Sequence, residues 1–134
     1  MAIYQPVVPS ASWPKSFTFS PGVRVGNLVF LSGTTATDEK GRIVGVGDII
    51  AQTRHIFQKF AAVMAAAGGG LEHIVKITQF LLHLRAHQPL LREVRAKFNN
   101  PELPPPASTM VQIGAFTREG ALYEVEAVAV LPPA

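Results

Sequence analysis

The sequence predicts a single α+β domain in which one mixed β-sheet carries two helices on one of its faces. Runs rich in β-branched and aromatic residues lie before, between and after two segments whose apolar residues recur every three or four positions. One sheet with both helices on the same face is the simplest packing that buries both apolar stripes. The length of 134 residues suits one domain, so we expect a single domain over residues 1–134, with 1–16 as an extended N-terminal segment.

The first part of the sheet is expected to be a hairpin. Residues 23–32 read V-R-V-G-N-L-V-F-L-S, two β-rich runs separated by Gly26 and Asn27. This pair suits the positive φ angles of a tight turn. We expect the first strand to begin near Phe17 and a short extended piece to follow the hairpin at residues 42–46.

A long helix is expected after Asp48, a residue type that caps helix N-termini. The apolar residues that form its stripe are Ile49, Ile56, Phe57, Phe60, Val63 and Met64. Polar residues such as Gln52 and Lys59 mostly fall away from that stripe. The glycines at positions 68, 69 and 70 are expected to end the helix.

A shorter helix is expected to begin at Pro89, because proline fits the first turn of a helix. The residues of its apolar face are Leu90, Leu91, Val94 and Phe98. Arg92 and Arg95 are expected on a solvated opposite face. Strands are expected before this helix at residues 74–84 and after it at 108–115 and 121–130, the last two joined by a turn around residues 118–120.

Composition excludes several classes of protein. There are no cysteines, so disulfides, thiolate zinc sites and cysteine nucleophiles are ruled out. Residues 1–14 lack the pattern of a signal peptide, and no apolar run approaches the ~20 residues that span a bilayer, so we expect a cytoplasmic protein. Charged residues are only 16%, against about 25% in an average domain, while 48% are hydrophobic. Such a small apolar domain is expected to bury part of its surface against copies of itself.

Two glutamates mark the candidate chemistry. Glu124 and Glu126 lie two positions apart in L-Y-E-V-E-A-V-A-V, so in a strand they share a face with Leu122 and Val128. A carboxylate among apolar neighbours either finds a partner or has a raised pKa, and the second outcome suits a general acid or base. The alternative is a solvated edge or ion pairs with arginines across an interface, which is the commoner use of such a pattern.

Other polar clusters carry weaker signals. The segment that begins Ser32-Gly33 directly follows the hairpin and would present hydroxyls and a backbone N–H to a ligand, or simply form a turn. His83 and His87 are four positions apart, but the predicted strand ends between them, so no metal site is expected. We expect no cofactor.

Four segments together resemble the RidA/YjgF family, the reactive intermediate deaminases that are also called L-PSP endoribonucleases or translation inhibitors. The segments are V-R-V-G-N-L-V-F-L-S-G, A-Q-T-R-x-I-F, A-A-G-G-G-L-E-H-I-V-K-I-T and E-V-E-A-V-A-V. They run in order from about Phe19 to Val130. The resemblance implies a chorismate-mutase-like fold and a homotrimer whose ligand clefts lie between neighbouring subunits.

The resemblance also implies which residues line the cleft, and this chain departs from the family at several of them. Glu124 matches the glutamate that positions the attacking water, and Gly33 matches a glycine that offers its N–H. Ser108, followed by Thr109, stands where the deaminases have an arginine that grips the substrate carboxylate. The other replacements are Phe19 for a tyrosine, Leu91 for an asparagine and Met110 for a cysteine. One subunit is expected to supply Phe19 and Gly33, and the next Ser108, Met110 and Glu124.

These assignments predict a hydrolytic deaminase that acts on an enamine or imine other than a simple 2-iminocarboxylate. Without the arginine, a 2-imino acid would lose roughly 1.5–3 kcal/mol of recognition. The alternative is a non-catalytic trimer that binds or scavenges a small metabolite. An endoribonuclease or translation inhibitor has the least support, because the chain lacks the basic groove and stacking aromatics of an RNA-binding protein.

Overall fold

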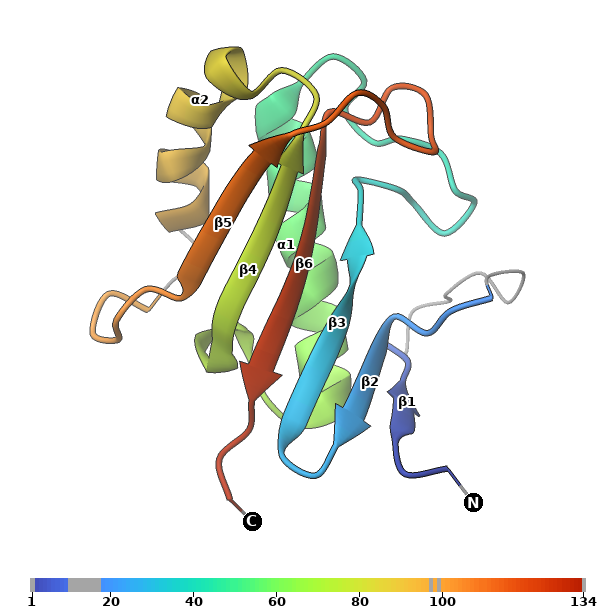
Figure 1. The fold of residues 1–134 in the computed structure, drawn as a ribbon, viewed down its shortest axis with the longest axis vertical. Coiled ribbons are helices and arrows are strands. Elements are labelled where there is room, and N and C mark those ends of the chain that lie inside the picture. Colours follow the sequence, from blue (N-terminus) through green and yellow to red (C-terminus); the bar gives the residue numbers. More distant parts are fainter. Residues whose placement is uncertain (1, 10–17, 97, 99, 134) are drawn as a thin grey trace.

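A six-stranded sheet in the order β1-β2-β3-β6-β4-β5 forms the body of the molecule (Figure 1). The computed structural model describes residues 2–9, 18–96, 98 and 100–133. The strands are β1 (Gln5–Val7), β2 (Gly22–Val25), β3 (Leu28–Thr34), β4 (Ile74–Leu81), β5 (Ala107–Gln112) and β6 (Tyr123–Val130). The helices are α1 (Ile49–Ala67), α2 (Leu84–Ala96) and a short 3-10 turn at Leu71–His73.

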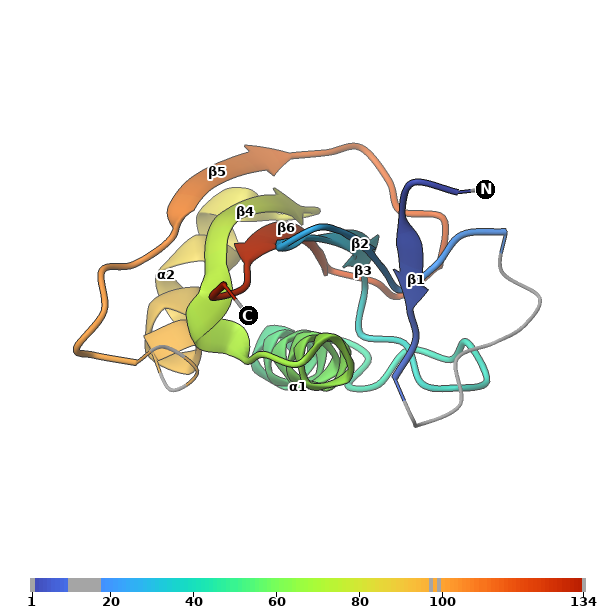
Figure 2. The same ribbon diagram turned by 90° about the horizontal axis from the view of Figure 1, so that it is seen from below.

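Both long helices pack on the same face of the sheet, as Figure 2 shows, which confirms the predicted architecture. The buried stripe of α1 contains the predicted residues, among them Ile56, Phe60 and Met64. These side chains pack against the helix-facing residues of the central strands, such as Val125 and Ala127. Among the described residues, no helix covers the other face of the sheet.

The first hairpin has the predicted form. Strands β2 and β3 are antiparallel, and Gly26 in the turn has a φ of 59°, which favours glycine. The strand begins at Gly22, whereas Phe17, where its start was expected, lies outside the described residues. The N-terminal segment was expected only to be extended, but part of it, β1, joins the sheet beside β2.

The caps of α1 are as predicted. Asp48 accepts hydrogen bonds from the backbone N–H groups of Ile50 and Ala51, and Gly68 ends the helix in the left-handed conformation. Gln52 departs from the prediction, because it is completely buried rather than turned away from the core. Its amide bonds to three backbone groups described below, which is how a buried polar side chain is accommodated.

The structure corrects three expectations about the bounds of elements. Strand β4 ends at Leu81 rather than residue 84, and α2 begins at Leu84, whose N–H donates to the Gln112 side chain. Pro89 therefore lies inside the helix and not in its first turn. It is exposed there, and its missing N–H leaves one helical hydrogen bond unmade. The expected extended piece at 42–46 is reduced to a single bridge between Thr37 and Ile43.

The last two strands occupy different positions in the sheet. Strand β5 lies at an edge and runs parallel to β4, whereas β6 is central and pairs antiparallel with both β3 and β4. The glutamates of β6 are therefore not on an edge strand, so the expectation of a solvated edge is wrong. The other half of that interpretation, ion pairs across an interface, stays a prediction. Within the described part of the chain, no helix is long and apolar enough to cross a membrane.

Candidate functional site

A cavity of about 230 Å³ lies where β3 and β6 reach the same end of the sheet. Its lining residues come from four segments of the chain, and they are Phe19, Gly33, Thr34, Thr35, Thr37, Thr117, Arg118 and Glu124. The cavity thus contains one carboxylate, one guanidinium and several hydroxyls. Three of the residues predicted for the site, Phe19, Gly33 and Glu124, meet here in one chain, whereas Glu124 was expected on the opposite side of a subunit interface from the other two.

A β-bulge brings Glu124 against the backbone of β3. The pairing of β3 with β6 shifts between Leu31 and Thr34, so one extra residue of β3 stands opposite this part of β6. Bulges of this kind redirect side chains and are common beside active sites. A β-carbon on Gly33 would lie only 2.6 Å from Oε1 of Glu124. Glycine at position 33 therefore makes room for the carboxylate.

Glu124 has the protonation behaviour of a candidate acid or base. Burial raises the pKa of its carboxyl group above the ordinary value, and the neighbouring charge of Glu126 raises it further. Glu126 is on the same face of β6 but is exposed. Two carboxylates two positions apart thus have different environments, and only Glu124 is placed to exchange protons with a ligand in the cavity.

Replacing Gly33 by alanine is expected to lower activity by about tenfold or more. The new methyl group would displace the Glu124 carboxylate, and even a small displacement of a catalytic group lowers the rate. Gly114→Ala is the control, because a β-carbon on Gly114 would meet no other atom within 4 Å. Steady-state kinetics of Gly33→Ala and Gly114→Ala would check this. Equal activity of the two variants would show that the carboxylate has no need of the space at Gly33.

One wall of the cavity is held by Lys59 of α1. Its ammonium group donates to the hydroxyls of Thr34 and Thr37, at 2.6 and 2.8 Å, and to the carbonyl of Thr35 at 3.1 Å. These three contacts use the three N–H donors of a lysine. Lys59 thereby fixes three residues that line the cavity, a role that its position off the apolar stripe did not indicate.

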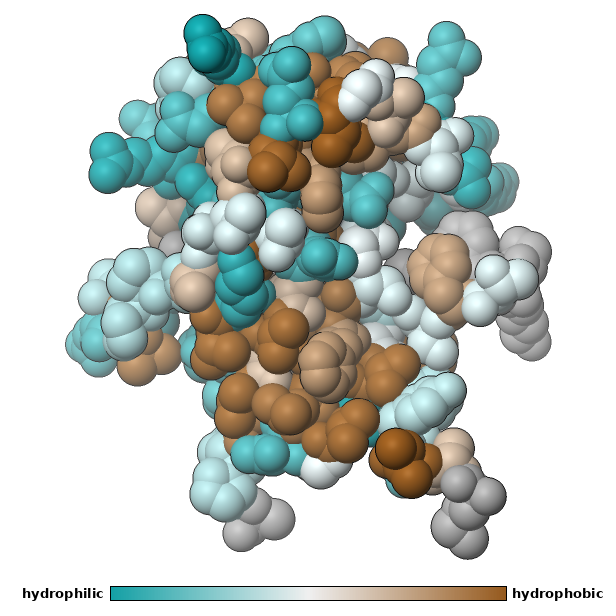
Figure 3. Space-filling view, in the orientation of Figure 1, coloured by the Kyte–Doolittle hydropathy of each residue, from teal (hydrophilic) through white to brown (hydrophobic). Residues whose placement is uncertain are grey.

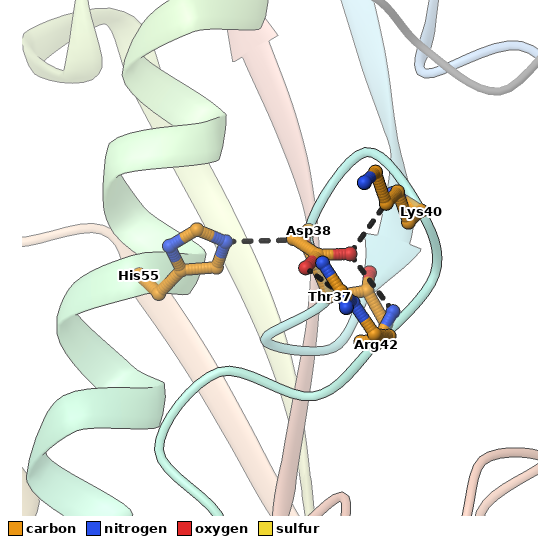
Figure 4. Close-up of polar contacts among 5 residues, drawn as sticks. All are labelled: Thr37, Asp38, Lys40, Arg42 and His55. Carbon is orange, nitrogen blue, oxygen red and sulfur yellow. Dashed lines mark hydrogen bonds and ion pairs between the residues drawn. The ribbon is translucent and has the colours of Figure 1, made fainter.

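A turn behind this wall is held by two further polar side chains (Figure 4). The Asp38 carboxylate accepts hydrogen bonds from the backbone N–H groups of Arg42 and Lys40, each at 2.9 Å, and the pKa of Asp38 is lowered, chiefly by the bond from Arg42. His55 of α1 lies 3.0 Å from the carbonyl oxygen of Thr37. His55 thus joins Lys59 in attaching the loop after β3 to α1, while Asp38 holds the turn of that loop.

Lys59 is expected to give the activity an alkaline limit. Burial lowers its pKa to about 8, assisted by the positive charge of Arg118 and opposed by Asp38. Below pH 8 the ammonium group makes all three contacts, and above it the neutral amine has one donor fewer. We therefore expect kcat/KM to fall as pH rises through about 8 and to fall roughly tenfold at neutral pH in Lys59→Met.

The pH–rate profiles of the wild type and Lys59→Met test this expectation. Lys40→Met, which changes an exposed lysine on the loop after β3, is the control. The profile of Lys59→Met should lack the fall in kcat/KM near pH 8. An unchanged limb in Lys59→Met would assign that titration to another group.

Arg118 enters the cavity from the turn between β5 and β6. Gln52 anchors this turn to α1, because its side-chain amide donates to the carbonyl oxygens of Gly45 and Gly120 and its oxygen accepts from the N–H of Leu122. No described carboxylate lies within ion-pair distance of Arg118. The guanidinium is therefore available to an anionic group of a ligand. The sequence offered Arg118 no signal beyond its turn.

The remaining predicted residues lie elsewhere. Ser32 donates its hydroxyl hydrogen to the carbonyl of Ser20 and is absent from the cavity lining. Ser108 and Met110 are on the helix-facing side of β5, and Thr109 is on the opposite side, where it accepts from Lys76. Leu91 is completely buried in the core, so in this chain it offers no surface to a ligand.

The histidines also differ from expectation. His83 immediately precedes α2 and His87 lies in it, so their rings are neighbours with centroids 5.8 Å apart. Burial lowers the pKa of His87, as does the proximity of His83. In the described ranges, no group of three or more histidine and acidic residues is arranged to hold a metal ion.

These observations define a class of protein. It is a small α+β sheet protein with one half-buried glutamate in a cavity at the end of its central strands. Comparisons with known proteins identify the family more closely. The family model described as Endoribonuclease L-PSP matches residues 11–131. The chain is 31% identical over 123 residues to the 3-aminoacrylate deaminase RutC of Acinetobacter baylyi, covering 92% of this chain and 94% of RutC.

Two further relatives extend the comparison. Protein DfrA of Myxococcus xanthus is 33% identical over 131 residues, covering 96% of this chain and 94% of DfrA. The crystal structure of RidA from an Antarctic Psychrobacter species superposes with a TM-score of 0.82 at 28% identity, over 95% of this chain and all of that one. The chain belongs to the RidA/YjgF/L-PSP family, as its sequence motifs indicated.

Proposed function

We propose that this protein is a hydrolytic deaminase acting on an enamine or imine whose carboxylate is not attached to the carbon that loses nitrogen. The observation that carries the proposal is the half-buried Glu124, whose carboxyl group has a raised pKa and lies against Gly33 in a cavity that also contains Arg118. The family includes enamine and imine deaminases such as RutC.

The substrate class follows from the distribution of cations. Ser108 stands where the family's deaminases have an arginine, and its hydroxyl faces the helices, away from the Glu124 cavity. Arg118 is the guanidinium beside Glu124. In 3-aminoacrylate, the compound in the name of RutC, the amino group is on carbon 3 and the carboxylate on carbon 1. A substrate with this separation can place its carboxylate at Arg118 and its reacting carbon at Glu124.

The chemistry requires one proton acceptor and one water molecule. A proton from solvent adds to the enamine carbon and gives an iminium group, and water then adds to the iminium carbon while Glu124 accepts a proton from that water. Glu124 returns this proton to nitrogen, the C–N bond breaks as the carbonyl double bond forms, and the hydroxyl proton is released to solvent. The sum is enamine plus water to ammonia plus a carbonyl compound, so atoms and charge balance. Glu124 is suited to both transfers because its pKa is raised towards neutrality.

We further propose that the protein is a cytoplasmic homotrimer. Apolar side chains gather on the open face of the sheet, over the lower ends of its central strands in Figure 3. The exposed apolar residues of these strands are Val25, Leu28, Phe30 and Val75. An exposed apolar patch usually marks an interface. In the trimer, a neighbouring subunit would cover this patch. We expect the same contact to bring Ser108 and Met110 of that neighbouring subunit towards the Glu124 cavity of this one.

If the protein is a trimer, its molar mass in solution should be three times 14.4 kDa. Light scattering at micromolar concentration is the measurement, with Phe30→Lys as the variant that places a charge in the patch and should shift the protein towards monomer. Glu39→Lys, a charge change on an exposed loop, is the control. If the wild-type protein is a monomer, there is no cleft between subunits and this proposal is wrong.

Ammonia release tests the proposed activity. 3-Aminoacrylate is generated in the assay, and the rate of ammonia release is compared with and without the protein. Acceleration proportional to protein concentration is expected. Saturable binding of the substrate without acceleration would instead support the alternative, a protein that binds such metabolites without converting them.

A further inference from the structure

The guanidinium group of Arg118 lies with one flat face against the backbone of Gly41. A β-carbon built on Gly41 would lie 2.9 Å from Nη2, 3.0 Å from Cζ and 3.1 Å from Nη1 of Arg118. A point that is almost equally far from these three atoms lies above the plane of the guanidinium and not at its edge. Gly41 is buried although it belongs to a turn, whereas Arg118 is exposed. Gly41 therefore gives this exposed side chain a flat support.

The turn that contains Gly41 is held by its own hydrogen bonds, part of which Figure 4 shows. The Asp38 carboxylate accepts from the backbone N–H groups of Lys40 and Arg42, and the Asp38 carbonyl accepts from the N–H of Gly41 at 2.9 Å. Gly41 has a φ of 78°, in the left-handed region that favours glycine. None of these bonds involves Arg118, so the support exists without it.

Gln52 fixes the distance between this loop and the turn that contains Arg118. Its side-chain nitrogen donates to the carbonyl oxygen of Gly45, in the same loop as Gly41, and to that of Gly120, in the same turn as Arg118. Gln52 is completely buried in α1, so both segments are attached to one point of the core. The packing of Arg118 on Gly41 is therefore determined by the fold.

Arg118 keeps this position although a second cation is near it. The positive charge of Arg118 lowers the pKa of Lys59, so the two cationic groups are close enough to repel each other. No carboxylate of the described residues lies within ion-pair distance of Arg118 to offset this repulsion. The support from Gly41 thus keeps a guanidinium beside Glu124, in a cavity that attracts anions.

We propose that Gly41 determines the preference of the Glu124 cavity for an anionic substrate, because it holds the plane of the Arg118 guanidinium. This role rests on the proposed function. A guanidinium donates hydrogen bonds in its own plane, so a fixed plane fixes the directions in which Arg118 can bind. A carboxylate matches two such donors at once, and a neutral ester does not. Gly41 touches no substrate and acts as a positioning residue through Arg118.

Gly41→Ala tests this role, and Gly47→Ala is its matched control. The two glycines lie in the same loop with φ angles of 78° and 75°, so alanine strains the backbone similarly at both. A β-carbon on Gly47 would meet no atom within 4 Å, whereas one on Gly41 would displace Arg118. Because Arg118 is exposed and can move aside, both variants should fold, with similar decreases in the midpoint of thermal unfolding.

Gly41→Ala is expected to raise KM for 3-aminoacrylate at least about fivefold and to leave KM for its methyl ester within about twofold of the wild type. Gly47→Ala should resemble the wild type with both compounds. In the background of Arg118→Gln, Gly41→Ala should raise KM no further, since its effect passes through the guanidinium. The NMR signal of the Arg118 Nε–H group needs no turnover, and it should move in Gly41→Ala but not in Gly47→Ala.

Equal effects of Gly41→Ala and Gly47→Ala on KM, an equal rise of KM for acid and ester, or an unmoved Arg118 signal in Gly41→Ala would each overturn the proposal. A wild-type protein that releases no ammonia from 3-aminoacrylate would instead overturn the proposed function. Isothermal titration with malonate then decides the role of Gly41, because Gly41→Ala alone should weaken malonate binding at least about fivefold. A wild type that neither releases ammonia nor binds malonate would overturn both.

Discussion

Glu124→Gln is expected to lower the rate of hydrolysis by about a hundredfold to ten-thousandfold, the usual contribution of general acid–base catalysis. The amide has nearly the shape of the carboxylate, so it fits beside Gly33, but it cannot accept a proton from water. The fold and the assembly should be unchanged. Rates of ammonia release under single-turnover conditions, together with light scattering and thermal unfolding, are the measurements.

The pH dependence gives this variant a second readout. The base must be ionised to accept a proton, so activity should fall as pH drops through the pKa of Glu124, which burial and Glu126 place above its ordinary value of 4.5. Glu126→Gln, a change to an exposed carboxylate on the same face of the same strand, is the matched control. It should retain most of the activity and move the acidic limb to lower pH, because one source of the raised pKa is removed. Retention of activity in Glu124→Gln would mean that another group activates the water.

Arg118→Gln is expected to raise KM for a carboxylate-bearing enamine by roughly tenfold to a hundredfold, the loss that corresponds to a charged hydrogen bond of about 1.5–3 kcal/mol. The guanidinium lines the Glu124 cavity and has no described carboxylate partner, so a substrate carboxylate is its natural contact. The effect on kcat should be smaller, since the contact exists before and during the reaction.

The methyl ester of the same substrate distinguishes charge from shape. Arg118→Gln should leave its KM almost unchanged, because the ester carries no charge for the arginine to bind. Arg54→Gln, which removes a charge from an exposed position of α1, is the control for general electrostatics. A similar rise of KM for acid and ester would show that Arg118 shapes the cavity rather than binding a carboxylate.

The fold was largely predictable because its signals are local. The Gly26-Asn27 turn, the Asp48 cap and the apolar stripe of α1 each depend on a few neighbouring residues, and all three are confirmed. The start of α2 was not predictable in this way. Its first N–H is satisfied by Gln112, 28 positions along the chain, and this contact lets the helix begin before Pro89.

The candidate site was only partly predictable for the same reason. The resemblance to the family indicated Glu124 and Gly33, and the structure brings them together. Lys59 and Arg118 reach the site from a helix and a turn that are distant in sequence, so no local pattern marks them. Arg95 was assigned to a solvated face by helical periodicity, which cannot show that Gln79 on β4 offers it a buried partner.

The most direct measurement is the relative rate of ammonia release by the wild-type protein from two isomers, 2-aminoacrylate and the enamine with its amino group on carbon 3. They contain the same atoms and differ in the distance between the carboxylate and the carbon that loses nitrogen. With Ser108 in place of an arginine and Arg118 beside Glu124, the protein should convert the second isomer at least about tenfold faster. Faster conversion of 2-aminoacrylate, or of its tautomer 2-iminopropionate, would contradict the account, because it would mean that a cation other than Arg118 binds the substrate carboxylate.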